Sequence, residues 1–462
     1  MNIENIHRVY LIGIGGIGMS ALARYFLYLG KDVAGYDSTQ TQLTAKLEEE
    51  EINICYVDKV GNIPEDFLEN PLTTLVVYTP AIPKSHKQFN FFKAKEFKVV
   101  KRAEALGAIS KSFTTLAVAG THGKTTTSTM AAHLLCQTEQ GCDAFLGGIA
   151  KNFSSNLVLR DNGSNRLVVE ADEFDRSFLH IEPSLAIITS IDADHLDIYG
   201  THDEVKAAFK LFVKNIKDGG VLIVKKGLEN IANERSDIKT YTYSVEEGSD
   251  FYASNLSPQN GFYTFDFVTP FGTYTDFKLG VLGKYNVENA IAAAAAALIW
   301  GINIESLKNG LATFSGVERR FEVKHQDEKC IYIDDYAHHP EELRAAISSA
   351  REIFPSRKIS GIFQPHLYSR TRDFASEFAQ SLSLLDELIL LDIYPAREEP
   401  IPGVSSQIIF NQVNIQEKVL CSYNELLGLV ENKKFDVLIS MGAGNIDKLT
   451  SKIASILKTR ES

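Results

Sequence analysis

Short apolar runs alternate with helical patterns along most of this chain. In the first hundred residues, the apolar runs at 8–14, 32–37 and 73–83 predict buried strands, because strands covered on both faces are apolar throughout. The segment 19–30 has the periodicity of an amphipathic helix and ends at Gly30. Strands that alternate with helices in this way predict parallel βαβ units.

The same alternation begins again at residue 113. A strand, a glycine-rich turn and a helix occupy 113–135, and apolar runs that end in acidic residues follow at 166–172 and 185–195. Another apolar run, at 221–226, continues the series. From about 240 to 282, aromatic or β-branched residues alternate with polar ones, which predicts a small antiparallel β part.

A third series of strands follows an alanine-rich helix at 289–300. The segment GVERRFE, at 316–322, separates that helix from the series, and we expect a domain boundary there. Four more apolar runs, each followed by polar residues, begin at Cys330, Lys358, Glu387 and Asp436. They predict a further sheet of buried strands, in a third domain.

Three domains agree with the chain length, because 462 residues are enough for two to four domains of typical size. We place the domain limits at 1–112, 113–316 and 317–462. The expected fold class is α/β. The first and last domains are expected to be Rossmann-like, and the central one to be a P-loop ATPase-type parallel sheet with the small antiparallel part.

Composition excludes several classes of function. The net charge of −12 argues against a nucleic-acid partner, because binding phosphates requires clustered Lys and Arg. The longest apolar stretch, 290–300, is too short to span a bilayer. The five cysteines are scattered and lack CxxC spacing, so neither structural zinc nor a disulfide framework is expected. We expect a cytoplasmic protein without membrane insertion.

The first glycine-rich turn is GIGGIG, at 13–18. It follows a predicted strand and precedes a predicted helix, the context in which GxGxxG lets a diphosphate approach the backbone at a helix N-terminus. Asp37, at the end of the next strand, lies where an acidic residue usually contacts a ribose. Taken alone, this pattern predicts a dinucleotide site and an NAD-dependent oxidoreductase. A close-packed turn without a ligand is the alternative.

The second glycine-rich turn is GTHGKTTT, at 120–127. Its backbone N–H groups can surround phosphates, Lys124 adds a positive charge, and the Thr125 hydroxyl can bind Mg²⁺. The pattern is not a strict GxxxxGK[ST], because Val118 occupies the first glycine position. A lysine at a helix N-terminus is disfavoured by the helix dipole unless an anion neutralises it, so we expect a nucleoside triphosphate here.

Acidic residues follow the strands that neighbour this turn. Glu170, in VVEADEFD, and Asp194 with His195, in SIDADHLD, stand at predicted strand ends that meet beside the phosphate turn. Mg²⁺ prefers hard oxygen ligands, which makes these residues candidates for metal binding or catalysis. One or two of the remaining acidic residues are expected to be ordinary surface charges, and these are Asp172, Glu173, Asp192 and Asp197.

These motifs occur together in a fixed order. They are GIGGIGMSALA, GTHGKTTT, EADEFDRSFLHIEP, DADHLDIYG, GKYNVENA, GVERRFE, DDYAHHPEE, FQPHLYSRTRDF, DIYPAREEPIPGV and MGAGNI. From about residue 8 to 447 the chain resembles the Mur ligase family. GTHGKTT alone is typical of a wider group that includes the folylpolyglutamate ligases. DDYAHHP, QPHLYSRTRD and YPAREEPIPG are similar to the alanine-adding branch.

The resemblance implies an ATP-dependent amide ligase of peptidoglycan precursor synthesis, with UDP-N-acetylmuramate and L-alanine as substrates. The first glycine turn would then hold the diphosphate of the UDP-sugar, and the second would hold ATP with Mg²⁺. The sugar's carboxylate would become an acyl phosphate, which the amine of alanine would attack. The protein would mainly position the reactants and neutralise charge. A monomer or weak homodimer is expected.

The resemblance also implies roles for individual residues. The catalytic set would be Lys124, Glu170, His195 and Arg320. The residues around ATP would be Gly120, Thr121, His122, Gly123, Lys124, Thr125, Thr126, Asn289, Arg320 and Asp335. The Mg²⁺ ligands would be Thr125, Glu170 and His195.

Two further sets would contact the other substrates. The UDP-sugar would contact Gly15, Gly16, Gly18, Asp37, Thr79, Arg102 and His122. L-Alanine would lie among Tyr336, His338, His366 and Arg370. Arg370 is the natural partner of the alanine carboxylate, because a guanidinium fork matches a carboxylate. Arg372 is expected to form a structural ion pair instead.

The chain departs from the family pattern at three places. Leu367 stands where some relatives carry a basic residue, and TPAIPKSH, at 79–86, replaces a more usual serine-rich turn. Phe209 occupies the position where other Mur ligases keep a carbamylated lysine. If that alignment holds, Mg²⁺ lacks this ligand here.

Three other functions remain to be distinguished. A murein-peptide recycling ligase would join a tripeptide to the same UDP-sugar and would need a roomier amino-acid pocket. An NAD-dependent oxidoreductase would leave GTHGKTTT without a purpose. A nucleotide-gated binding protein would bind ATP without releasing ADP in response to the other substrates.

Overall fold

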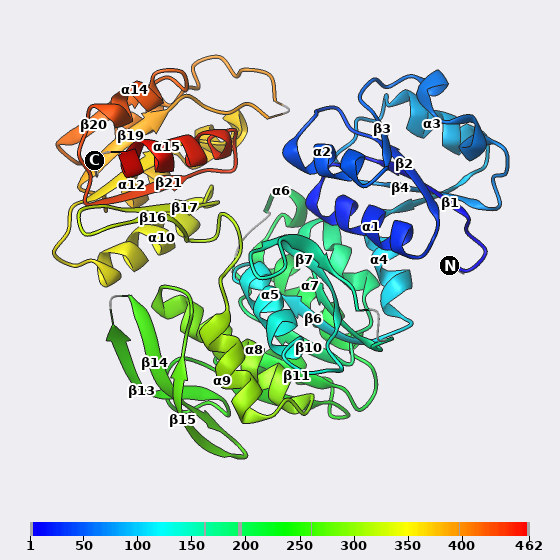
Figure 1. Ribbon diagram of the computed structural model, residues 1–462, viewed down its shortest axis with the longest axis horizontal. Helices are drawn as coiled ribbons and strands as arrows, with labels where there is room; N and C mark the ends of the chain where they lie inside the picture. Colours follow the sequence, from blue (N-terminus) through cyan, green and yellow to red (C-terminus); the bar gives the residue numbers. More distant parts are fainter. Residues whose placement is uncertain (1–2, 161–162, 193–195, 260, 397, 460–462) are drawn as a thin grey trace. The chain divides into compact units, whose positions relative to one another are not determined.

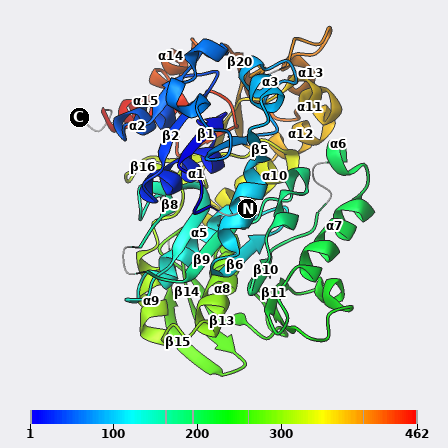
Figure 2. The same ribbon diagram turned by 90° about the vertical axis from the view of Figure 1, so that its right-hand side faces the viewer.

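The structure is a computed structural model that describes residues 3–160, 163–192, 196–259, 261–396 and 398–459. Its contacts divide the chain into two compact units. The first unit comprises 1–257, 264–280 and 287–316, and the second comprises 258–263, 281–286 and 317–462. The two units are described separately below, and their elements can be followed in Figure 1 and Figure 2.

The first unit begins with a five-stranded parallel sheet, drawn in blue in Figure 1, with the order β3-β2-β1-β4-β5. Its strands are β1 (Arg8–Ile12), β2 (Asp32–Tyr36), β3 (Asn53–Cys55), β4 (Thr74–Tyr78) and β5 (Lys98–Lys101). Its helices are α1 (Ile17–Tyr28), α2 (Gln42–Glu49), η1 (Val60–Asn62), η2 (Glu65–Leu68), α3 (Lys87–Ala94) and α4 (Arg102–Ser110). This strand order matches the first five strands of the doubly wound order 3-2-1-4-5-6, so the sheet is Rossmann-like.

Alternate residues of these strands enter two different cores, because successive side chains of a strand point to opposite faces. Leu11 and Val77 pack in the core that contains Phe26 of α1. Tyr10 and Val76 pack in the core that contains Phe92 of α3. The sheet is therefore covered on both faces, which explains why its strands are apolar throughout.

A seven-stranded sheet follows in the same unit, with the order β12-β11-β10-β6-β9-β7-β8. The strands are β6 (Thr114–Ala119), β7 (Asp143–Ala150), β8 (Ser155–Val158), β9 (Arg166–Glu170), β10 (Leu185–Ile188), β11 (Val221–Lys225) and β12 (Lys239–Tyr243). All neighbours are parallel except β7 and β8. The strand that leads into the second glycine turn, β6, lies between β9 and β10, so the ends of those two strands flank the turn.

The helices of this part include α5, which begins directly after the second glycine turn and contacts β6, β7 and β9. They are α5 (Lys124–Leu135), η3 (Phe174–His180), α6 (Leu196–Tyr199), α7 (His202–Lys214), η4 (Glu229–Ala232), α8 (Lys284–Ile299) and α9 (Ile304–Thr313). The small sheet has the order β13-β14-β15, with β14 and β15 antiparallel. Its strands are β13 (Tyr252–Gln259), β14 (Phe262–Thr269) and β15 (Gly272–Lys278).

The second unit contains a six-stranded sheet with the order β16-β17-β21-β18-β19-β20. Its strands are β16 (Glu322–Gln326), β17 (Ile331–Asp335), β18 (Ile359–Phe363), β19 (Glu387–Leu391), β20 (Glu417–Cys421) and β21 (Val437–Met441). Its helices are α10 (Pro340–Ile353), α11 (Tyr368–Asp373), α12 (Ala375–Leu382), α13 (Gln407–Phe410), α14 (Leu426–Glu431) and α15 (Asp447–Thr459). Only β16 runs antiparallel to its neighbour, β17.

The two faces of this sheet are also covered by different helices. Ile333 and Ile439 pack with Leu343 of α10 in one core. The neighbouring residues Tyr332 and Leu438 pack with residues of α14 and α15 in the other. The result is a three-layer arrangement of helices, sheet and helices, as expected for buried parallel strands.

The predicted α/β fold, with three sheet systems and a small antiparallel part, is confirmed, while several strands escaped prediction. These strands are β3, β5, β7, β8, β12, β16 and β20. Two of them, β16 (EVKHQ) and β20 (EKVLC), are edge strands that carry charged residues. Charge at a sheet edge prevents pairing with other chains but also weakens the apolar pattern. Within the described ranges, no helix is both long and apolar enough to cross a bilayer.

One glycine fixes how closely α4 approaches η3. A Cβ atom at Gly107 would lie 2.4 Å from the carbonyl oxygen of His180. We predict that Gly107→Ala lowers the free energy of unfolding by about 1–3 kcal/mol, because the two backbones must separate. Urea unfolding followed by the fluorescence of Trp300, the chain's single tryptophan, measures this.

The matched control is Gly61→Ala. Gly61 is exposed in η1, and an added Cβ there would meet no atom within 4 Å. Its unfolding free energy should stay within about 0.5 kcal/mol of the unmodified protein. Equal effects of the two substitutions would contradict the predicted close approach.

Candidate active site

The turn between β6 and α5 depends on two glycines. Gly120 has φ +141° and Gly123 has φ +79°, backbone conformations that residues with a side chain rarely adopt. A Cβ at Gly120 would lie 2.0 Å from Oγ1 of Thr189, and one at Gly123 would lie 2.9 Å from Oδ1 of Asn289. Both positions therefore require glycine for space as well as for conformation.

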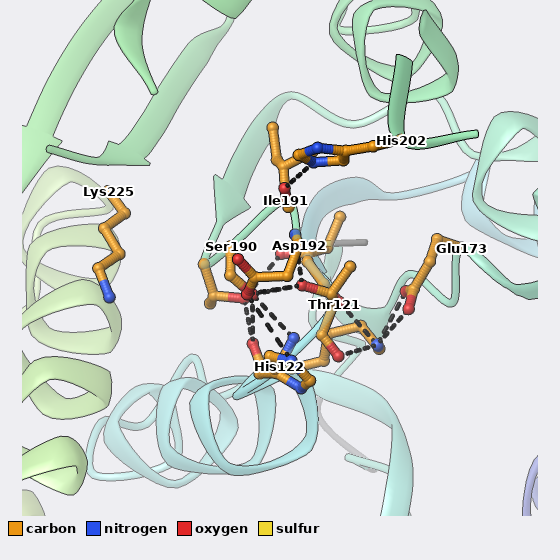
Figure 3. A network of polar contacts seen from close by, with 12 residues as sticks. Thr121, His122, Glu173, Ser190, Ile191, Asp192, His202 and Lys225 are labelled. Atoms are coloured by element: carbon orange, nitrogen blue, oxygen red, sulfur yellow. Dashed lines mark hydrogen bonds and ion pairs between the residues drawn. The ribbon is translucent and has the colours of Figure 1, made fainter. Parts of the chain in front are cut away.

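Residues that follow β10 hold this turn in place (Figure 3). The backbone N–H of His122 donates to Oγ of Ser190 at 2.8 Å, and Oγ1 of Thr189 donates to the His122 carbonyl. The Thr121 and Ser190 hydroxyls lie 2.8 Å apart, and the N–H of Asp192 donates to Thr121 Oγ1 at 3.0 Å. These bonds fix the turn before any ligand binds.

Lys124, the first residue of α5, is held by oxygen atoms. Its Nζ donates to the carbonyls of Gly120, at 2.6 Å, and Thr121, at 3.3 Å. The same Nζ lies 2.9 and 2.8 Å from the two carboxylate oxygens of Glu173, whose side chain is only 1% exposed. Burial lowers the pKa of Lys124, but nearby carboxylates, Glu173 foremost, outweigh burial and raise it. The buried ammonium is therefore charged.

Asn289 of α8 lies against the same turn. Thr127 Oγ1 donates to Asn289 Oδ1 at 3.2 Å, and Asn289 is 9% exposed. Thr125, on the first turn of α5, is 5% exposed, and Thr126 beside it is half-buried. The structure thus brings together the predicted residues from Gly120 to Thr126 and Asn289.

Glu170 ends β9, beside the strand that leads into the turn. Its carboxylate lies against the backbone of Gly147, where a Cβ would be 2.0 Å from Oε2. The Thr125 hydroxyl and the Glu170 carboxylate are hard oxygen donors, and this chemistry fits Mg²⁺. Asp194 and His195 lie outside the described residues. Among the residues that the structure describes, no cluster of three or more His, Cys, Asp or Glu side chains is suited to a metal.

Phe209 provides no metal ligand. It lies on α7, is fully buried, and packs edge-on against Phe178 with ring centroids 5.1 Å apart. The helix begins at His202 and is capped by Thr201, whose side chain accepts the N–H of Glu204. Its apolar face places Phe209 in the core. The position that the resemblance assigns to a modified lysine therefore holds a buried core side chain.

The first glycine turn is packed against two of its predicted partners. A Cβ at Gly13 would lie 2.4 Å from Cγ2 of Thr79, and one at Gly15 would lie 2.9 Å from Oδ2 of Asp37. The N–H of Gly15 donates to the same Asp37 oxygen at 2.8 Å. Gly16 precedes α1, and its N–H donates to the Gly13 carbonyl. Asp37 therefore braces the turn, in addition to any contact with a ligand.

The third partner connects the turn to the larger sheet. Arg102, at the start of α4, lies against Gly18, with Nη1 2.8 Å from a Cβ built there. Its guanidinium also lies 3.6 Å from the carboxylate of Asp172. The preceding residue, Lys101, pairs with Asp175 at 2.9 Å. Two adjacent cations thus join the first turn to the segment that follows Glu170.

In the second unit, Arg320 stands between two residues with left-handed backbones, Arg319 at φ +61° and Phe321 at φ +48°. The guanidinium groups of Arg319 and Arg320 both lie over the ring of Tyr336, 5.2 and 5.4 Å from its centroid. Asp335 accepts the Phe321 N–H at 2.7 Å. Burial raises the pKa of Asp335 to about 6, with Arg320 opposing the shift.

The residues predicted for alanine lie together in the second unit. His338 Nδ1 is 3.0 Å from the Tyr336 carbonyl, and its ring lies 6.1 Å from that of His366. Burial lowers the pKa of His338, and the positive charge of Arg370 lowers it further. Within the described part of the chain, Nη1 of Arg370 is buried and has no hydrogen-bond partner. A buried guanidinium nitrogen of this kind suits a carboxylate.

Leu367 has a strained backbone at this site, with φ +71° and ψ 136°. Its N–H donates to the Tyr394 carbonyl at 3.0 Å, which holds the strained residue between His366 and α11. Strain of this kind costs about 1–3 kcal/mol and often marks a functional site. Arg372 forms the predicted ion pair, with Asp373, and both side chains are about half exposed.

Sequence reasoning missed two features of the phosphate turn. The sequence did not distinguish Glu173 from Asp172, Asp192 and Asp197, of which one or two were expected to be ordinary surface charges, whereas the structure buries Glu173 against Lys124. Thr189 and Ser190 were not singled out either. A signal existed for both: polar residues directly follow apolar strands whose C-terminal ends flank the turn.

Comparisons with known proteins agree with this geometry. The "Mur ligase family, catalytic domain" model matches residues 8–114, the "Mur ligase middle domain" model matches 118–297, and the "Mur ligase, glutamate ligase domain" model matches 319–444. A UDP-N-acetylmuramate–L-alanine ligase of Parabacteroides distasonis is 54% identical over 99% of this chain and 98% of its own length. The chain belongs to the Mur ligase family.

Solved structures of other Mur ligases share its fold. A crystal structure of UDP-N-acetylmuramate-alanine ligase from Thermotoga maritima has a TM-score of 0.82 and 27% identity, covering 98% of this chain and 100% of that one. A murein peptide ligase from Psychrobacter arcticus has a TM-score of 0.72 and 22% identity, covering 98% of both chains. The second likeness shows the fold alone.

The close contact of Gly123 with Asn289 generates a prediction. Gly123→Ala should weaken MgATP binding at least tenfold, because the added methyl group distorts the turn at its closest packing point. Isothermal titration calorimetry measures this. Gly219→Ala is the control, since Gly219 also has a positive φ, +71°, but a Cβ there would meet nothing within 4 Å. Unchanged binding by Gly123→Ala would contradict the predicted role of the turn.

Proposed function

We propose that this protein is an ATP-dependent ligase that joins L-alanine to the lactyl carboxylate of UDP-N-acetylmuramate, releasing ADP and phosphate. The observation that carries the proposal is the turn from Gly120 to Thr126, with its buried Lys124 and the Glu170 carboxylate at the adjacent strand end. The relative that is 54% identical to this chain is named for this activity, and the match covers nearly its whole length. Mur ligases are ATP-dependent, and the reaction belongs to peptidoglycan precursor synthesis.

Each part of the chain has a proposed task. Residues 1–112 would bind the UDP-sugar, residues 113–316 would bind ATP, and residues 317–462 would bind alanine. Gly13, Gly15 and Gly18 pack against Thr79, Asp37 and Arg102. This packing supports the first assignment, because it places the turn at the start of α1, and a helix N-terminus attracts a diphosphate. The chain is further proposed to act in the cytoplasm, as a monomer or weak homodimer.

The first chemical step converts a poor electrophile into a reactive one. The sugar's carboxylate oxygen attacks the γ-phosphorus of ATP, the bond from that phosphorus to the bridging oxygen breaks, and ADP leaves. Lys124 supplies positive charge where negative charge is spread over the transferring group, and the turn's N–H groups orient it. Arg320 would provide a second cation from the third domain.

A magnesium ion would neutralise phosphate charge in this step. Thr125, Glu170 and His195 are the residues proposed to hold it. The hydroxyl and carboxylate oxygens among them suit a hard cation that keeps several waters. Phe209, buried in the core, adds no ligand.

The second step forms the amide. Arg370 binds the alanine carboxylate, and Tyr336, His338 and His366 surround the amino acid. The neutral amine attacks the carbonyl carbon of the acyl phosphate and forms the C–N bond. The amine proton passes to solvent, and the tetrahedral intermediate breaks its C–O bond to release inorganic phosphate. The lowered pKa of His338 supports this arrangement, because a neutral imidazole beside Arg370 does not repel an ammonium group as a charged one would.

A ligation assay tests the proposal against its closest alternative. Release of ADP should require both UDP-N-acetylmuramate and L-alanine. Preference for the tripeptide L-Ala-γ-D-Glu-meso-diaminopimelate would instead identify a recycling ligase. Nucleotide binding without substrate-dependent ADP release would identify a binding protein, and hydride transfer to a nicotinamide would identify an oxidoreductase.

Lys124→Ala should reduce turnover to background, a loss of at least a thousandfold, because charge on the transferring phosphoryl group is no longer compensated. Steady-state ADP release measures this effect. Lys206→Ala is the control, since Lys206 is an exposed lysine of α7 paired only with Asp203 nearby. Full activity of the Lys124 variant would refute the assigned role.

Arg370→Lys should raise the KM for L-alanine about tenfold to a hundredfold while changing the KM for ATP little. An ammonium group cannot form the two parallel hydrogen bonds of a guanidinium to a carboxylate. Arg372→Lys, two residues further on, is the matched control, because its partner is the exposed Asp373. Equal effects at both positions would contradict the alanine assignment.

A further inference from the structure

Glu173 is a buried carboxylate that the reaction described above does not use. It precedes η3, its side chain is 1% exposed, and its backbone carbonyl accepts the Tyr199 hydroxyl at 2.6 Å. The N–H of Arg176 donates to the same carbonyl at 2.9 Å. The backbone of Glu173 is therefore fixed from two sides, and its carboxylate accepts a hydrogen bond from Lys124 Nζ.

The other acids of this segment have different partners. Asp172 faces Arg102 and Asp175 binds Lys101, so both interact with cations at the start of α4. Glu173 alone among these three lies within hydrogen-bond distance of Lys124 in the described structure. A substitution of Glu173 therefore leaves in place the ion pairs of Asp172 and Asp175, which connect the segment to the first glycine turn.

The contacts of Lys124 use its full donor capacity. An ammonium group has three N–H donors, and its acceptors here are two carbonyls of the turn and the Glu173 carboxylate. The carbonyls fix the ammonium against the turn, and the Glu173 carboxylate compensates its charge by direct contact. A buried lysine without a compensating carboxylate tends to lose its proton or to move.

A triphosphate changes this balance. Its γ-phosphate needs the same ammonium group, and it is repelled by a carboxylate nearby. Glu173 therefore has two opposite effects on the reaction: it weakens ATP binding through repulsion, and it keeps Lys124 charged and directed at the turn. Removing the charge of such a residue should therefore lower kcat without weakening the binding of ATP.

We propose that Glu173 is a positioning residue of the ligation reaction, which holds Lys124 Nζ at the phosphate turn and gives up this ion pair to the γ-phosphate. The inference rests on the proposed function, since Lys124 is assumed to act on the transferring phosphoryl group. Glu173 itself touches no substrate in this scheme.

The test compares Glu173→Gln with the unmodified protein. Glutamine preserves volume and a hydrogen-bond acceptor but removes the charge. We expect kcat to fall at least tenfold, while the KM for ATP stays equal or falls. Glu173→Asp, which keeps the charge but shortens the side chain, should recover part of the lost kcat. Glu182→Gln is the control, because Glu182 is a half-exposed acid whose partner is Lys111.

Several outcomes would overturn the inference. An unchanged kcat in Glu173→Gln would do so, as would a higher KM for ATP with kcat intact, the result expected from simple damage to the turn. Circular dichroism and thermal unfolding establish that each variant is folded. If Glu173→Gln does not fold, Glu173→Asp provides the test. A lower kcat without a higher KM for ATP in this variant supports the inference, and any other result contradicts it.

Failure of the proposed function gives a different result. In that case the unmodified protein would release no ADP in response to UDP-N-acetylmuramate and L-alanine. Calorimetric titration with MgATP alone still tests Glu173. Equal or tighter binding by Glu173→Gln supports the ion-pair exchange, and binding at least tenfold weaker refutes it.

Discussion

The structure of the second glycine turn, the proposed nucleotide site, depends on placing a positive charge at the start of a helix. Lys124 is the first residue of α5, where the helix dipole disfavours a cation. Local contacts offset this unfavourable interaction with the dipole, because Lys124 Nζ donates to the carbonyl of Gly120 and to the Glu173 carboxylate. Three features of the site serve to hold this charge in place. They are the positive-φ glycines of the turn, the hydroxyl groups that follow β10 and the buried carboxylate that follows β9.

The first glycine turn meets a related constraint by a different route. It carries no lysine, and the cation beside it, Arg102, comes from α4 and contacts Gly18. Asp37 accepts a hydrogen bond from the turn, so this acid stabilises the loop itself. The two glycine turns, although similar in sequence pattern, therefore receive their positive charge from different elements.

Much of the fold could be predicted because buried parallel strands carry their signal in every residue. The strands β1, β4, β6 and β10 are apolar along most of their length, and their residues are mostly buried. Edge strands such as β16 and β20 carry charged residues, so their pattern is indistinguishable from that of a loop. The residues of the second turn were predictable for another reason. Few structures other than a phosphate-binding turn place glycine and lysine in that order.

What sequence alone could not supply is which acid faces which cation. Asp172, Glu173 and Asp175 lie within four positions, and their partners are Arg102, Lys124 and Lys101. The backbone decides this, because Asp175 and Arg176 adopt left-handed conformations that reverse the chain after Glu173. The turn directs Glu173 inward and lets Asp175 reach Lys101. Consecutive left-handed residues other than glycine have no reliable sequence signal, because local propensity disfavours them and tertiary contacts must stabilise them. The pairing of charges in this segment is therefore a property of the folded chain.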